Sequence, residues 1–267
     1  MRTLPIIEKL GSYTGEEPVM FSPFHLCFLI GFYLLTIIII LLFRNSRRST
    51  MKLIVFIAWI ILVIFEITKQ LISCYWYGRY YWGNFPLQFC EIPLYIYPIL
   101  ILNRNKKIEN ALISFCATFS LFGGLAILTL PFTGLSTLVF HSVRTMVHHG
   151  IIMVIGFYLF AWNRRFMTMK NFFKGSVVFV ITVIVAVIFN KVMDARVEDK
   201  VNMFFLNPKY ETTLLIMKRI QPHVHWIIFD LLYIIFFMII AFTTFVVEHL
   251  VWRLCTFIEK KTHKAQL

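Results

Sequence analysis

Residues 22–43 read SPFHLCFLIGFYLLTIIIILLF and contain no Asp, Glu, Lys or Arg. A helix of about 20 mostly apolar residues is long enough to cross the hydrocarbon core of a bilayer. The run is too long for a secretory signal peptide and lacks a small-residue cleavage site, and its basic cluster follows it instead of preceding it. This stretch therefore predicts a membrane-spanning helix and sets the fold class for the rest of the chain.

The whole chain shares this apolar character. Of its 267 residues 59% are hydrophobic and 15% are charged, and the mean hydropathy is +0.77. A soluble domain is typically nearer half apolar and a quarter charged, so a single soluble globule is excluded. The formal net charge is +13, from 26 Lys and Arg against 13 Asp and Glu. Because cytoplasmic loops of membrane proteins collect Lys and Arg, this excess does not indicate nucleic acid as a partner.

Similar apolar stretches recur along the chain, separated by polar or aromatic segments. We therefore expect an all-α polytopic membrane protein in which residues 1–267 form one membrane domain with seven transmembrane helices. The expected spans are residues 22–43, 52–74, 86–103, 107–129, 136–162, 171–192 and 224–253.

The charge of the connecting segments alternates and predicts the orientation. Basic residues follow the first, third, fifth and seventh spans, whereas segment 75–85 is aromatic, 130–135 is uncharged and 191–223 carries both signs. Cytoplasmic loops are the basic ones, so the N-terminus is expected outside and the C-terminus in the cytoplasm, with the plasma membrane as the expected location. The basic residues are Arg44, Arg47, Arg48, Lys52, Arg104, Lys106, Lys107, Arg164, Arg165, Lys170, Lys174, Arg253, Lys260, Lys261 and Lys264.

Polar and ionisable side chains within the spans give the functional signal. Each costs several kcal/mol in hydrocarbon, so such groups usually face a bundle interior and mark a site. With the topology above, they gather at one depth in the outer leaflet. The candidate substrate-binding residues are Gln88, Glu66, Lys69, Gln70, His141, Arg144, Asn190 and Asp230.

Simpler interpretations compete with a site. Glu66 and Lys69 lie three residues apart and fit an intrahelical ion pair equally well. A single histidine on a membrane helix is more often a hydrogen-bonded packing residue than a catalyst. Five histidines at one depth nevertheless favour a functional role for at least one of His141, His148 and His149.

Cys90 is the candidate nucleophile. Pro86 suits the first turn of a helix, so Cys90 is expected near a helix N-terminus, where the dipole favours the thiolate. Two alternatives stay open: a small buried apolar residue, and a disulfide to Cys74. No Walker loop, Gly-rich dinucleotide turn or CxxC pair occurs, and neither a metal nor a cofactor is expected.

Several short motifs, taken in order, resemble the YwaF-like integral membrane proteins over nearly the whole chain. They are Phe21-Ser22-Pro23-Phe24-His25, Glu66 with Gln70, Pro86-Leu87-Gln88-Phe89-Cys90, Gly123-Gly124, His149-Gly150, and the stretch from Asn190 through Asn202 to Phe205-Leu206-Asn207-Pro208.

This resemblance implies a seven-span group that includes a eukaryotic cysteine-dependent phospholipid acyltransferase, in which a Cys and a His carry an acyl group between lipids. Matching positions make Cys90 the cysteine and His149, the histidine before glycine, its partner. The sequence departs from the family pattern where His148 precedes His149, so either histidine can be the base. It departs again at the end of the pattern, usually rich in Trp and Pro, which here reads Gln221-Pro222-His223-Val224-His225-Trp226.

We therefore expect membrane lipids as partners and acyl transfer as the reaction. Cys90 would attack a donor ester, and His149 or His148 would move the proton. The oxyanion or the phosphate would be held by Gln88, Arg144 or Asn190.

Two other functions remain as alternatives. A lipid hydrolase would use the same pair with water as the acceptor. A binding or proton-coupled transport protein would use the group Glu66, Lys69, Arg144 and Asp230. Transporters typically have broken helices in paired repeats, which the sequence does not indicate. It does not indicate an oligomeric state either.

Overall fold

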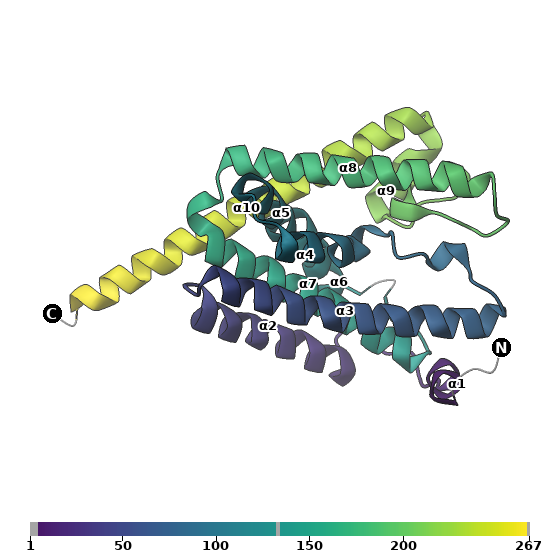
Figure 1. Ribbon diagram of the computed structural model, residues 1–267, viewed down its shortest axis with the longest axis horizontal. Helices are drawn as coiled ribbons and strands as arrows, with labels where there is room; N and C mark the ends of the chain where they lie inside the picture. The colour runs from purple at the N-terminus through teal and green to yellow at the C-terminus, as the bar shows by residue number, and fades with distance from the viewer. Residues whose placement is uncertain (1–4, 132–133, 266–267) are drawn as a thin grey trace.

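The computed structural model describes residues 5–131 and 134–265, and these form helices joined by loops (Figure 1). Within these ranges there is no β-strand, and an isolated β-bridge joins Thr14 to Leu138. The helices are α1 (Pro5–Ser12), α2 (Pro23–Phe43), α3 (Arg48–Tyr77), α4 (Pro93–Leu102), α5 (Lys106–Phe115), α6 (Leu121–Thr129), α7 (Val139–Asn163), α8 (Met169–Asp194), α9 (Leu215–Ile220) and α10 (Trp226–Ala265).

Six helical segments of the described chain are long and apolar enough to cross a membrane. The prediction of an all-α polytopic membrane protein is confirmed at this level. The segments are Pro23–Phe43, Arg48–Tyr77, Lys106–Thr129, Val139–Phe166, Met169–Asp194 and Trp226–Phe257.

The expected third span, 86–103, differs from the prediction. Its helical part is Phe89–Leu102, a 3₁₀ turn followed by α4, which at 1.5 Å per residue is about 21 Å long against a hydrocarbon core of about 30 Å. Proline explains the difference: Pro93 begins α4 and Pro98 lies inside it, so residues 86–92 do not continue the α-helix backwards and only a 3₁₀ turn precedes it. Cys90 consequently lies in the 3₁₀ turn before α4.

Helix α7 forms the centre of the bundle, between α2, α3 and α6 (Figure 1). Of an 18-residue apolar stretch of α7, 83% of the residues are buried inside the protein. The corresponding share is 6% in α2 and 22% in α10. The peripheral helices therefore present their apolar side chains to lipid, and the polar side chains of α7 must find partners inside the protein.

Small residues allow α6 and α7 to approach closely. A Cβ atom at Gly124 would lie 2.8 Å from the carbonyl oxygen of His149, and one at Gly156 would lie 2.7 Å from Leu121 Cβ. Close backbone approach at small residues is the usual way in which membrane helices pack. The close approach at Gly124 therefore sets the distance between α6 and the α7 backbone at His149.

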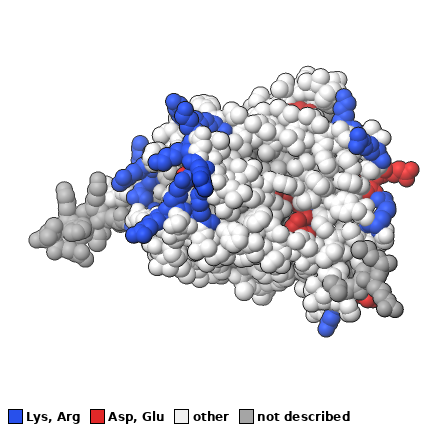
Figure 2. All heavy atoms as spheres, viewed as in Figure 1, with Lys and Arg blue, Asp and Glu red and all other residues white. Residues whose placement is uncertain are grey.

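Lys and Arg gather at the end of the bundle from which α10 projects, and acidic residues appear with them at the opposite end (Figure 2). At this basic end Arg48 pairs with Glu109, and Lys52 donates to the carbonyl oxygens of Ile101 and Asn103. Two arginines, Arg44 and Arg164, lie over the ring of Trp252.

Candidate functional site

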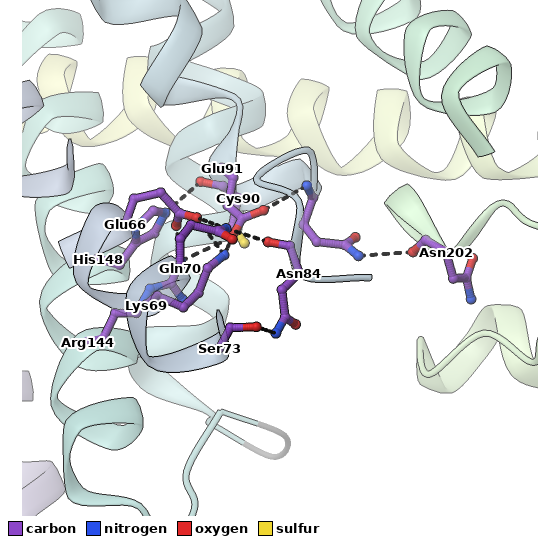
Figure 3. A network of polar contacts seen from close by, with 11 residues as sticks. Glu66, Lys69, Gln70, Ser73, Asn84, Cys90, Glu91, Arg144, His148 and Asn202 are labelled. Carbon is purple, nitrogen blue, oxygen red and sulfur yellow. Dashed lines mark hydrogen bonds and ion pairs between the residues drawn. The ribbon is translucent and has the colours of Figure 1, made fainter. Parts of the chain in front are cut away.

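Side chains from three elements converge at the non-basic half of the bundle (Figure 3). Helix α3 contributes one face of its last turns, the 3₁₀ turn before α4 contributes a second group, and α7 contributes a third. The converging residues are Glu66, Lys69, Gln70, Gln88, Cys90, Glu91, Arg144 and His148.

Four charged side chains form the charged ring, which we define as Glu66, Lys69, Glu91 and Arg144. Lys69 Nζ lies 2.8 Å from Glu66 Oε1 and 2.8 Å from Glu91 Oε1. Arg144 Nη2 lies 2.7 Å from Glu66 Oε2 and 3.1 Å from Glu91 Oε1. Each cation therefore contacts both carboxylates, and the ring has no net formal charge.

The charged ring is buried, with side-chain exposures between 6% and 15%. Ion pairs removed from water lose hydration energy, and only close pairing with further hydrogen bonds offsets that loss. Such bonds are present: Gln70 Nε2 donates to Glu66 Oε1 at 2.6 Å, and the Gln88 backbone N–H donates to Glu91 Oε2 at 3.0 Å. The intrahelical Glu66–Lys69 pair considered from the sequence exists, but as one edge of this larger ring.

Cys90 lies beside the ring and carries a free thiol. All five cysteines are within the described residues and none forms a disulfide, so the alternative of a bond to Cys74 is wrong. His148 Nε2 lies 2.9 Å from the carbonyl oxygen of Cys90. A carbonyl only accepts, so Nε2 carries the proton and Nδ1 presents a lone pair.

His149 points to another side of α7 and has the opposite arrangement. Its Nδ1 lies 2.8 Å from the carbonyl oxygen of Thr145, so Nδ1 donates and Nε2 has the lone pair. The rings of His148 and His149 meet edge to face with centroids 5.5 Å apart. The two histidines therefore offer two different nitrogen atoms as bases.

Three buried polar atoms at this site have no hydrogen-bond partner among the described residues: Gln70 Oε1, Arg144 Nε and His148 Nδ1. Buried polar atoms are nearly always paired, and each exception calls for an explanation. Two acceptors and one donor left open at one place are what a site for a polar ligand group requires.

Gln88 braces the turn that carries Cys90 against the segment 202–207. Its Nε2 donates to the carbonyl oxygen of Asn202 at 2.9 Å, and its Oε1 accepts from the Phe204 N–H at 2.9 Å. Asn190 on α8 bonds both backbone groups of Met203, at 2.7 and 3.0 Å. Both predicted polar residues thus belong to one support beside the charged ring.

The supported segment contains two residues in the left-handed region, Phe204 with φ 56° and Phe205 with φ 59°. This conformation is unfavourable for bulky side chains and persists only where surrounding contacts enforce it. Phe204 is fully buried and packs edge to face on Phe89, the residue before Cys90. The strained segment therefore packs directly against the 3₁₀ turn that carries Cys90.

A second link joins two loops at the end of the bundle opposite the basic end. Arg79 donates to both carboxylate oxygens of Asp199, at 3.0 and 2.5 Å, and the Trp82 N–H donates to Asp199 at 2.7 Å. The hydrogen bond from Arg79 is the main cause that lowers the pKa of Asp199 below its ordinary value. Asp199 therefore ties loop 78–88 to the segment that follows α8.

Two predicted residues make no hydrogen bond or ion pair with the charged ring. His141 is one turn before Arg144 on α7, is half-buried and has no hydrogen bond to a described residue. Asp230 on α10 lines a separate hollow of about 310 Å³ with Trp226 and Phe229. The sequence placed all of these at one depth, but depth alone does not bring helices into contact.

Sequence reasoning did not assign a site role to Glu91, Asn84 or Asn202. Glu91 completes the ring, and Asn84 accepts from Gln70 through its carbonyl and donates to Ser73 Oγ at 2.8 Å. The signal for Glu91 was present, because a carboxylate in a predicted span needs a cation as partner. Asn84 and Asn202 lie in loops, where sequence spacing predicts no contact.

Among the described residues no group of three or more His, Cys, Asp or Glu side chains is arranged to hold a metal ion. Comparison with known proteins gives one match. A model of the TMEM164 family matches residues 20–242, which is most of the chain, and the chain belongs to this family. No curated protein and no solved structure matches it.

Proposed function

We propose that this member of the TMEM164 family is a membrane-embedded phospholipid acyltransferase that uses Cys90 and a histidine of α7. The observation that carries the proposal is the contact between His148 Nε2 and the Cys90 carbonyl oxygen at 2.9 Å, which leaves His148 Nδ1 buried and without a partner. A nucleophile, a base and a group that orients the base are the parts of a covalent acyl-transfer site. Here the backbone of the nucleophile itself orients the base.

The proposed reaction has two halves. The Cys90 thiol gives its proton to the histidine, and the sulfur attacks the ester carbonyl carbon of a donor phospholipid. The ester C–O bond then breaks, the leaving oxygen takes the proton from the imidazolium, and a thioester and a lysolipid remain. In the second half, the hydroxyl of an acceptor lysolipid gives its proton to the histidine and attacks the thioester. The C–S bond breaks, the leaving thiolate takes the proton from the imidazolium, and the Cys90 thiol is restored.

The cations of the charged ring would stabilise the negative charge that develops on the ester oxygen. Arg144 Nε is a buried donor without a partner, and Lys69 has one N–H beyond its two carboxylate contacts. Donors already oriented in a water-poor site stabilise an oxyanion more than mobile donors do. The two glutamates keep both cations in place while the ring stays neutral.

Topology follows from charge in this proposal. The basic end, where Arg48, Lys52 and Arg164 lie, faces the cytoplasm, and the short segment Phe89–Leu102 counts as the seventh crossing. The site would then act on the outer leaflet, with the N-terminus outside and the C-terminus inside. The YwaF-like resemblance and the expectation of a plasma-membrane location belong to the same proposal.

Purified protein in nanodiscs tests the function. The donor is a phospholipid with a deuterated acyl chain, the acceptor is a lysophospholipid, and products are quantified by mass spectrometry. Wild type should transfer the chain, Cys90→Ser should not, and Cys74→Ser should match wild type because Cys74 lies outside the charged ring. Equal transfer by Cys90→Ser would overturn the mechanism.

The same assay separates the alternatives. Release of free deuterated fatty acid without dependence on the lysolipid would identify a hydrolase. Intact-mass measurement of wild type with donor alone should show the acyl adduct on a peptide containing Cys90. Saturable ligand binding without any adduct or product would favour a binding or transport protein instead.

A further inference from the structure

A groove of about 350 Å³ lies at the basic end of the bundle, between the start of α8 and the cytoplasm-proximal half of α10, far along the chain from the charged ring. Its walls are mostly apolar, and its charged or titratable members are His249 and Arg253. The lining residues are Met167, Thr168, Met169, Phe245, Val246, His249, Leu250 and Arg253.

His249 lies in the wall of the groove and is held there by backbone contacts. Its Nδ1 lies 2.7 Å from the carbonyl oxygen of Phe245, and its Nε2 lies 2.9 Å from the carbonyl oxygen of Met167. The Phe245 ring packs on the imidazole with its centroid 4.3 Å away. His249 therefore joins α10 to the segment that precedes α8 and forms the floor of the groove beside Arg253.

Arg253 brings a positive charge to the rim of the groove, and its guanidinium makes no hydrogen bond or ion pair with any described residue. Its neighbour Trp252 lies under Arg44 and Arg164, which bring further cations to the same surface. Glu248, the nearest acid in sequence, is buried in the bundle, does not line the groove and makes no ion pair with His249. The groove is therefore apolar along its walls and cationic at its end.

The apolar walls face lipid. Met169, Val246 and Leu250 are exposed in the protein, and they belong to helices whose outer faces are apolar along their length. A cationic end beside an exposed apolar groove at membrane depth matches a ligand with an anionic headgroup and an acyl chain.

From this arrangement we infer that the α8–α10 groove binds an anionic phospholipid of the leaflet at the basic end, with the phosphate at the Arg253 guanidinium and an acyl chain along Val246 and Leu250. This site is separate from the proposed acyl-transfer site and does not depend on it.

Native mass spectrometry of detergent-purified protein titrated with phosphatidylglycerol or phosphatidylcholine tests the inference. Wild type should retain phosphatidylglycerol preferentially. Arg253→Gln should weaken retention about fivefold, the effect of one Lys or Arg beside an anionic membrane surface. Arg219→Gln is the matched control, because it removes the same charge from an exposed site at the other end and should leave retention unchanged.

A second variant tests the groove itself. Leu250→Trp keeps all charges and fills the apolar wall, so it should reduce the retention of phosphatidylglycerol without changing the melting temperature. Equal retention of the two lipids by wild type would overturn the inference. So would equal losses in Arg253→Gln and Arg219→Gln, because the effect would then reflect net charge alone.

Discussion

The two ends of this bundle treat charge in opposite ways. In the charged ring, two cations and two carboxylates contact each other in a buried, neutral group. At the basic end, cations outnumber acids, and the Arg253 guanidinium has no hydrogen-bond or ion-pair partner among the described residues. Charge inside hydrocarbon must be paired, whereas charge at the membrane surface can be held by lipid headgroups. The charged ring is therefore a site of paired charges, whereas the basic end is a surface with an excess of positive charge.

Three histidines of the bundle also differ in their hydrogen-bond partners. His25 accepts from the Phe21 N–H and contacts the Leu128 carbonyl, so the neutral ring is fully satisfied and serves packing. His148 has one carbonyl partner and one open nitrogen, and His249 has two carbonyl partners. The three histidines therefore differ in their hydrogen-bond partners, and depth in the membrane does not determine those partners.

Breaking the charged ring should have the largest effect. Glu91→Gln removes one carboxylate and leaves two buried cations with one partner, so unfolding should become easier by about 3–5 kcal/mol. Glu109→Gln at the basic end also breaks an ion pair, but its partner Arg48 is 37% exposed, so the loss there should be within about 1 kcal/mol. Thermal melting in detergent measures both.

Neutrality itself can be tested in the same series. Adding Lys69→Met to Glu91→Gln restores a ring with one charge of each sign and should recover part of the lost stability. If the double variant melts lower than either single variant, pairing is not what holds this part of the bundle together.

The identity of the base gives the next effect. His148→Gln should lower acyl transfer by about 100-fold or more, the usual contribution of a general base, with little change in melting temperature. His149→Gln should lose less, because its Nδ1 contacts only its own helix. Rates measured with the nanodisc assay decide the order. The opposite order would assign the base to His149, as the resemblance implies.

Much of this site follows from sequence, and the remainder follows from contacts between distant segments. The i, i+3, i+4 spacing correctly grouped Glu66, Lys69 and Gln70 on one face of α3. The length of the third span was wrong because hydropathy does not record that Pro93 begins a helix. Asp230 was expected with the ring, but it lines another hollow, with Trp226 and Phe229.

Loosening the support of the cysteine turn should have a moderate effect. Asn190→Ala leaves both backbone groups of Met203 buried without partners, which costs about 1–3 kcal/mol for each such group. The strained pair Phe204 and Phe205 should then relax. Hydrogen exchange of the backbone amides should increase in residues 202–207. The amides of the α3 and α7 residues that carry the charged ring should keep their protection. Faster exchange throughout α3 would contradict a local role.

The smallest effect should come from the pair Arg79 and Asp199, in which the Arg79 side chain is 59% exposed and only the Asp199 carboxylate is buried. Arg79 keeps the pKa of Asp199 below its ordinary value of 3.8. A carboxyl with a lowered pKa in the folded state stabilises the fold above its ordinary pKa, and that stabilisation is lost as the pH falls through the lowered value. Arg79→Gln should therefore melt slightly below wild type at pH 7, and the two curves should converge as the pH falls below about 4. Exchange of the Trp82 amide, which donates to Asp199, should increase in the same variant. If the difference between the curves is as large at low pH as at neutral pH, Arg79 acts through packing, and the two loops are joined by contacts other than this ion pair.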